Sequence, residues 1–193
     1  MVILYRYVII ESKQHKPIDD DVISLFSELI SPSSIKNNSD HTIMFFEHDI
    51  DLAFEDVILN VMSDTLTDLR VYASHAVSSV QERDIYVQAI QQYMDQIPFE
   101  KYYFLDDKII IKHFIYRLSE DMKSLFLNKF YKDQVMIETL KVYLESNLNM
   151  VNAAKKLYIH RNTLIQRLDK FYQVTGLDAR LFSEALLVYH LIH

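Results

Sequence analysis

Residues 158–168 read YIHRNTLIQRL and start a helix-forming stretch whose first turn is unusually polar. The four side chains of that turn, HRNT at positions 160–163, can all form hydrogen bonds, and leucines follow at positions 164 and 168. Asparagine and glutamine can pair with adenine through two hydrogen bonds, threonine can contact the thymine methyl group, and basic side chains bind phosphate. The stretch is therefore chemically suited to contacting the base edges of DNA.

The residues just before this stretch predict a second helix that packs closely against it. In a helix-turn-helix the first helix needs small residues at the crossing, and the turn needs a buried side chain. Ala153 and Ala154 permit the approach, while Leu157 and Ile159 are expected to fill the corner. On a wheel of about 100° per residue, one side of the second helix is apolar: Leu164, Leu168 and Phe171. The opposite side is polar: Asn162, Thr163, Gln166 and Lys170.

The formal net charge of −7 hides a basic segment. Residues 1–132 carry a net −8, and residues 133–193 carry +1. Within residues 149–172, five lysines and arginines stand against a single acid, Asp169, which gives +4. A local basic surface can bind phosphates on an acidic protein, although a solvated helix face explains the same charges.

We predict that the two helices and their turn contact double-stranded DNA. The predicted contact residues are Lys155, Lys156, His160, Arg161, Asn162, Thr163, Gln166, Arg167 and Lys170. Lys155 and Lys156 suit phosphates rather than bases, and Arg167 lies on the flank of the helix. Arg161 has an alternative role, because the wheel puts it nearer the buried side, where an ion pair with Glu145 would brace the preceding helix.

The first two-thirds of the chain alternates β-rich runs with helical periods, which predicts a small sheet covered by helices. The expected strands are 3–10, 42–48, 69–76 and 102–105, with 109–111 as a further candidate. The expected helices are 18–30, 52–66 and 82–96. The loop SPSSIKNNSD, residues 31–40, is expected to be irregular.

From about residue 112 onward the β signal disappears, and helical periods continue to residue 193. Residues 112–132 are expected to form one linking helix. Asp133 is suited to cap the helix that follows, and Gly176 can supply a left-handed residue at the end of the polar-faced helix. Asp178 is suited to cap the last helix.

The segment NMVNAAKKLYIHRNTLIQRLDKFYQVTGLD resembles the C-terminal helix-turn-helix of the purine-catabolism and sugar-diacid regulators, the PucR/CdaR-like family. The hallmark N-x-x-x-A-A-x-x-L-x-x-H-R-N-T-L-x-x-R-L, followed by T-G-L-D, is present. The resemblance covers most of residues 133–193 and implies a recognition helix from His160 to about Val174. Leu148 and Tyr158 depart from the pattern, because such motifs prefer glycine there. The same core also resembles the Fis-like helix-turn-helix.

Upstream, residues 68–94 are similar to part of the degenerate cyclase-like (GGDEF-like) domain that precedes this motif in the same family. A cyclase needs a glycine-rich turn that lets backbone amides approach nucleotide phosphates. The only glycine of the chain is Gly176. We therefore expect the N-terminal domain to be structural, dimerising or sensing, and the protein not to be an enzyme.

Other candidate sites have simpler interpretations. Acids and His48 within residues 46–56 would suit a metal ion, but carboxylates also favour the start of a helix, as do the three aspartates at 19–21. The sequence has no cysteine, which excludes thiolate metal sites, and no metal or cofactor is expected. The apolar start, residues 1–10, is too short to span a bilayer and is expected to be a buried strand.

The predicted fold class is α+β, with a small α/β GGDEF-like domain over 1–111, the linking helix over 112–132, and an all-α helix-turn-helix domain over 133–193. The predicted function is a cytoplasmic transcription regulator that binds DNA as a homodimer, without membrane association and with an unknown small-molecule effector as a further possible partner. The principal alternative is a protein-interaction module whose helix-turn-helix no longer reads DNA. An enzyme related to nucleotide cyclases is a more distant alternative.

Overall fold

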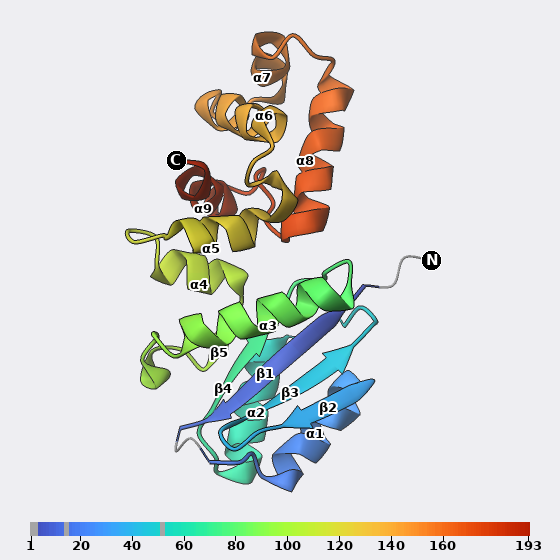
Figure 1. Cartoon of the computed structure of the whole chain (residues 1–193), viewed down its shortest axis with the longest axis vertical. Helices are drawn as coiled ribbons and strands as arrows, with labels where there is room; N and C mark the ends of the chain where they lie inside the picture. The colour runs from blue at the N-terminus through green and yellow to red at the C-terminus, as the bar shows by residue number, and fades with distance from the viewer. Residues whose placement is uncertain (1–3, 14–15, 51–52) are drawn as a thin grey trace. The chain divides into compact units, whose positions relative to one another are not determined.

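A computed structural model describes residues 4–13, 16–50 and 53–193. The chain divides into two compact units, residues 1–110 and residues 111–193 (Figure 1). The first unit combines a sheet with helices, whereas the second is helical, so the fold is mixed α and β as expected. No helix within the described residues is long and apolar enough to cross a membrane.

The described part of the first unit contains a five-stranded sheet in the order β2-β3-β1-β4-β5. Its strands are β1 (Arg6–Ser12), β2 (Ser34–Asn37), β3 (His41–Phe46), β4 (Leu69–Ala73) and β5 (Phe104–Leu105). Neighbouring strands are antiparallel except β4 and β5, which are parallel. Strand β1 is central and buried along almost its whole length, because helices cover both faces of the sheet.

Helices α1 (Asp20–Ile30) and α2 (Phe54–Thr65) cover one face of the sheet, and α3 (Val80–Met94) covers the other (Figure 1). On the first face, Phe26 and Ile58 pack in one core cluster with Val8. The 3₁₀ turn η1 (Phe99–Lys101) leads from α3 to β5.

A buried ion pair ties the sheet to the residues around it. Arg70 forms a 2.6 Å ion pair with Glu11 and donates to the carbonyl oxygens of Met94 and Ile97. These hydrogen bonds remove most of the cost of burying the two charges. The arrangement joins β1 and β4 to the end of α3.

A second buried group, Asp107, fixes the start of α4 (Asp107–His113). Its carboxylate accepts a 2.6 Å hydrogen bond from the Tyr72 hydroxyl and lies 2.5 Å from Nδ1 of His75. Burial, together with the nearby Asp107 carboxylate, raises the pKa of Tyr72 well above its usual value, so the hydroxyl stays protonated and donates. The contact holds α4 against β4.

The second unit is built from α5 (Glu120–Leu127), the 3₁₀ turn η2 (Asn128–Phe130), α6 (Gln134–Glu145), α7 (Met150–Lys156), α8 (Arg161–Thr175) and α9 (Phe182–Ile192). Helix α6 is at its centre and contacts α7, α8 and α9. Buried side chains such as Phe130, Leu140 and Phe171 form the core.

Several sequence-based predictions about elements are wrong. The candidate strand at 109–111 lies in helix α4, because the Asp106 side chain accepts the N–H of Ile109 and caps the helix. The loop at 31–40 contains β2, whose four residues are all exposed and therefore lack the alternation that marks a strand.

Residues 112–132 do not form one linking helix. Helix α4 ends at His113, and the Ser119 hydroxyl accepts the N–H of Met122 to start α5. A local cap of this kind stabilises a new helix start and so interrupts the continuous apolar period. The expected strand 3–10 and helix 52–66 begin at residues outside those that the structure describes.

Candidate nucleic-acid interface

The interface is positioned by α7, α8 and the four residues between them. The Asn149 side chain caps α7 by accepting the N–H groups of Val151 and Asn152 at 3.1 and 3.0 Å. Ala153 and Ala154 are buried, so their small side chains lie in the packed interior of the unit, where α7 contacts α8. The chain then turns with backbone hydrogen bonds from Leu157 to Ala153 and from Ile159 to Ala154.

The turn keeps a left-handed backbone without glycine. Tyr158 has φ 54° and Leu148, before α7, has φ 58°. Both residues stand where related motifs prefer glycine, and a side chain at such φ costs about 1–2 kcal/mol per residue. Tyr158 and Leu148 therefore adopt the left-handed conformation that glycine would favour, and they do so at a cost in strain. The Tyr158 side chain is 96% exposed beside the start of α8.

Helix α8 has local signals at both ends. His160 is its N-cap residue, and Nδ1 of the ring accepts the N–H of Asn162 at 3.2 Å. Gly176 ends the helix with φ 70°, and its N–H donates to the Tyr172 carbonyl at 2.8 Å, which confirms the predicted cap. Asp133 likewise accepts the N–H of Met136 at the start of α6, as predicted.

The apolar side of α8 is buried and its polar side is exposed. Leu164, Leu168 and Phe171 are each at most 2% exposed. Seven of the nine predicted contact residues are exposed: Lys155, Lys156, His160, Arg161, Asn162, Gln166 and Lys170. Thr163 and Arg167 are partly buried. No ion pair between Arg161 and Glu145 occurs within residues 53–193, and Arg161 is exposed.

Arg167 has a partner within the protein. Its Nη1 donates a 2.7 Å hydrogen bond to the Thr139 hydroxyl on α6, and that hydroxyl donates in turn to the Val135 carbonyl at 2.7 Å. Thr139 is completely buried. The side chain predicted to contact DNA therefore braces α8 against α6.

Sequence reasoning missed Arg180, which joins the middle of α8 to the loop that follows the helix. Its guanidinium contacts Asp169 on α8 at 2.6 Å and Asp178 in the following loop at 2.7 Å. The hydrogen bond to Asp178 raises the pKa of Arg180 above its usual value. Helix α9 begins at Phe182 and its N-cap residue is Leu181, so the prediction that Asp178 caps α9 is wrong. The short spacing within LDAR was the available signal for this contact.

The ion pair of Arg180 neutralises the one acidic side chain near the basic surface. Asp169, the only acid within residues 149–172, is paired with Arg180. In the described part of the second unit, no ion pair involves the lysines of α7 or Lys170. Beside α7 a hollow of about 370 Å³ is lined by Glu145, Ser146, Asn147, Asn152, Lys155 and Lys156. The exposed surface is therefore basic and rich in hydrogen-bonding groups, as phosphates and base edges require.

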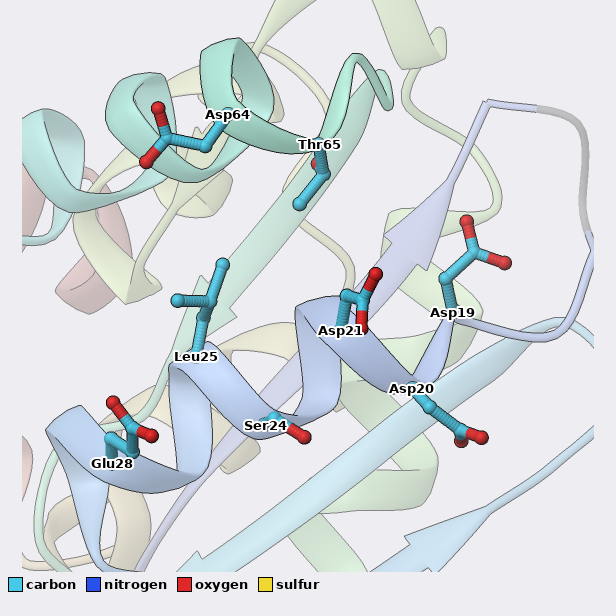
Figure 2. A pocket seen from close by; sticks show the side chains of 8 residues that line it. All are labelled: Asp19, Asp20, Asp21, Ser24, Leu25, Glu28, Asp64 and Thr65. Atoms are coloured by element: carbon cyan, nitrogen blue, oxygen red, sulfur yellow. The ribbon is translucent and has the colours of Figure 1, made fainter.

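A second hollow lies in the first unit between α1 and α2 and measures about 710 Å³. Its lining is mainly acidic, as Figure 2 shows: Asp19, Asp20, Asp21, Ser24, Leu25, Glu28, Asp64 and Thr65. Asp20 and Asp21 lie in the first turn of α1, where carboxylates complement the helix dipole. Their position at the start of α1 accounts for these two carboxylates.

The contacts and positions of several acids in segment 46–56 explain them without a metal ion. Asp49 forms a 2.6 Å ion pair with Arg6, and Glu55 and Asp56 lie in the first turn of α2. Asp51 lies outside the described residues. Among residues 4–13, 16–50 and 53–193, no group of three or more side chains has the arrangement of a metal site.

Helix α7, its turn and helix α8 with its exposed polar face have the arrangement of a helix-turn-helix. Residues 136–192 match the family described as the PucR C-terminal helix-turn-helix domain. This match confirms the resemblance that the HRNTL and TGLD motifs indicate.

Several curated relatives are similar to part of this chain. The protein YxkF of Bacillus subtilis is 39% identical over 72 residues, which are 37% of this chain and 23% of that protein. The purine catabolism regulatory protein of B. subtilis is 39% identical over 64 residues, 30% of this chain and 12% of that protein. The carbohydrate diacid regulator of Escherichia coli is 41% identical over 51 residues, which are 26% of this chain and 13% of that protein. The chain thus spans less than a quarter of each relative.

A solved structure of a regulator of polyketide synthase expression from Bifidobacterium adolescentis aligns with 98% of this chain and 78% of its own. The sequence identity is 14% and the TM-score is 0.43. The likeness is too low for an inference about either unit.

Proposed function

We propose that the protein is a sequence-specific DNA-binding transcription regulator whose recognition helix is α8. The observation that carries the proposal is the exposed polar face of α8 within a PucR-type helix-turn-helix. Two of the curated relatives are named as regulators, which supports the same class. Neither name describes an enzyme, which agrees with a non-enzymatic role.

The residues divide by chemistry. Arg161, Asn162, Thr163 and Gln166 are our candidates for base contacts, because their exposed or partly exposed groups lie on the first two turns of α8. Lys155, Lys156 and Lys170 are candidates for phosphate contacts. His160 and Arg167 position α8 through the contacts described above.

The base contacts are tested by selecting bound sequences from randomised duplex DNA with the wild-type chain, Asn162→Ala and Gln166→Ala. Both side chains are exposed, so folding stability should change by less than about 0.5 kcal/mol. Specific binding should weaken by ~1–3 kcal/mol, with preference relaxed at one position of the site. Folded variants with wild-type affinity and preference would refute the proposal and favour a protein-interaction module.

The phosphate contacts are tested through salt. Each phosphate contact contributes about 0.9 to the slope of log affinity against log salt, because bound cations displace counterions. Lys155→Ala should weaken binding to all sequences and reduce that slope by about one. If the affinity of both the wild type and Lys155→Ala for DNA does not depend on salt, Lys155 does not contact phosphate.

We also propose that the regulator is cytoplasmic, where bacterial DNA lies, and that it binds as a homodimer. Two-fold pairing would put the recognition helices one DNA turn, about 34 Å, apart.

For the first unit we propose a GGDEF-like domain without cyclase activity. The mixed sheet covered by helices is compatible with this assignment, and the absence of a glycine-rich turn argues against nucleotide chemistry. Incubation with GTP and Mg²⁺ or Mn²⁺ should give no cyclic dinucleotide. Turnover that persists through stringent purification would overturn the assignment.

A further inference from the structure

The turn between α7 and α8 carries a tyrosine whose side chain the fold does not use (Figure 1). Tyr158 is 96% exposed, and its backbone is left-handed with φ 54°. Within the part of the chain that the structure describes, its side chain forms no hydrogen bond, ion pair or ring contact. Its backbone N–H donates to the Lys155 carbonyl at 3.2 Å, so only the main chain of Tyr158 takes part in the turn.

A left-handed residue without glycine has a packing explanation at the turn before α7. Leu148 has φ 58°, but its side chain is partly buried, so apolar contacts can offset the strain. Tyr158 has no such compensation, because its side chain is in solvent. Backbone strain that packing does not offset is found most often at functional contacts.

Strain and exposure alone do not identify a contact. Leu66, the C-cap residue of α2, is 92% exposed with φ 53°, and its side chain has neither a donor nor an acceptor. Two features separate Tyr158 from Leu66. Tyr158 has a hydroxyl that can donate a hydrogen bond, and it lies within the candidate nucleic-acid interface.

Exposed basic and polar residues flank Tyr158 along the chain. Lys155 and Lys156 form the last turn of α7, and His160 caps α8 two residues after the tyrosine. All three side chains are exposed. Residues 149–168 contain no aspartate or glutamate, so the charge of this segment is positive and attracts an anion.

We propose that the Tyr158 hydroxyl donates a hydrogen bond to a phosphate of the DNA backbone. This contact belongs to the proposed DNA-binding function and rests on it. Tyrosine hydroxyls are among the groups that bind phosphate oxygens in protein–DNA complexes. Tyr158 precedes α8 and is not on the face of the helix that enters the groove, so a phosphate is its ligand and the base edges are left to α8.

The contact positions the recognition helix. Tyrosine has fewer rotatable side-chain bonds than lysine and so loses less conformational entropy when a ligand orders it. Because Tyr158 is two residues before the N-cap of α8, a phosphate held by its hydroxyl fixes the start of the helix against the DNA backbone. Phosphate contacts set register and carry no sequence information. Tyr158 should therefore affect affinity for every sequence and leave sequence preference unchanged.

The main test compares wild type with Tyr158→Phe by fluorescence anisotropy on a duplex that wild type selects, at about 50 to 200 mM salt. Phenylalanine removes only the hydroxyl, so hydrogen exchange in α7 and α8 should stay unchanged. Affinity should fall about 3- to 10-fold, the effect of one hydrogen bond. The dependence of affinity on salt should match wild type, because an uncharged side chain displaces no counterion, whereas Lys155→Ala flattens it.

A second variant separates binding from folding. Tyr158→Gly removes the hydroxyl and the left-handed strain together, so it should slow hydrogen exchange in α8 while weakening DNA binding at least as much as Tyr158→Phe. A side chain with only a structural role would not move stability and affinity in opposite directions. Leu66→Gly is the matched control: it relieves the same strain in the first unit and should leave DNA affinity unchanged.

The contacted phosphate is located with uncharged methylphosphonates placed one at a time in the selected duplex. At the phosphate that Tyr158 contacts, the methylphosphonate should weaken wild type more than it weakens Tyr158→Phe, because that variant has already lost the bond. At all other phosphates the two proteins should lose affinity equally. Equal losses at every phosphate would overturn the proposed contact.

The remaining outcomes separate this contact from the proposed function. Wild-type affinity of Tyr158→Phe for the selected duplex overturns the contact and leaves the function intact. A loss confined to sequences with one particular base also overturns it, since the tyrosine then reads a base. A wild-type chain that binds DNA without preference, and binds less tightly as Tyr158→Phe, refutes the sequence-specific function and supports the contact. A wild-type chain that binds no DNA refutes both.

Discussion

Arg167 offers the sharpest test of how the helix-turn-helix is held together. The structure assigns it to a 2.7 Å hydrogen bond with the buried Thr139 hydroxyl, whereas its residue type and position suit a phosphate contact. The two roles predict different results for the same substitution. The appropriate comparison is a double-mutant cycle with Arg167→Ala and Thr139→Val.

The expected size follows from the geometry. A hydrogen bond with a charged partner contributes about 1.5–3 kcal/mol when buried, and partial exposure of Arg167 lowers this to ~1–2 kcal/mol. Thr139 keeps its bond to the Val135 carbonyl when the arginine is removed, so no buried hydroxyl is left unpaired. Each single variant should lose about 1–2 kcal/mol, and the pair should be coupled by about 1 kcal/mol.

The chain has two units and no tryptophan, so a single unfolding transition is a poor assay. Native-state hydrogen exchange of α6 and α8 measures the stability of the second unit directly. Lys170→Ala is the matched control, since its side chain is exposed on the same helix: exchange should stay unchanged, while the salt slope of DNA binding falls by about one. The reasoning fails if Thr139→Val leaves exchange unaltered and Arg167→Ala behaves like Lys170→Ala.

Three further outcomes are expected from the structure. Leu164→Ala should lower the stability of the second unit by ~2–5 kcal/mol, because Leu164 is completely buried, as measured by hydrogen exchange in α8. Tyr158→Gly should raise stability by about 0.5–1 kcal/mol by relieving the left-handed residue, whereas Tyr158→Ala should give no gain. His160→Ala should cost about 1 kcal/mol through loss of the α8 cap and His160→Asn should restore it; equal exchange in both variants would contradict the capping role.

In the first unit, two elements could not be predicted from the sequence pattern. Its buried strands and amphipathic helices follow from local apolar periods, and the sequence predicted most of them. Strand β2 was missed because all four of its residues are exposed, and among the described strands it pairs with β3 alone. The stretch at 109–111 was misassigned because three isoleucines suit a buried strand as well as a buried helix, and the Asp106 cap decides between them.

In the second unit, the sequence alone determined the helix-turn-helix, the apolar side of α8 and the caps at Asp133 and Gly176. These features depend on residues within a few positions of one another, so spacing is enough to predict them. Only the tertiary structure decided that Arg167 contacts Thr139, which is 28 residues away, and that Arg180 pairs with Asp169. Such contacts depend on how the helices pack, and the spacing of residues along one helix carries no information about the side chains that another helix brings to it.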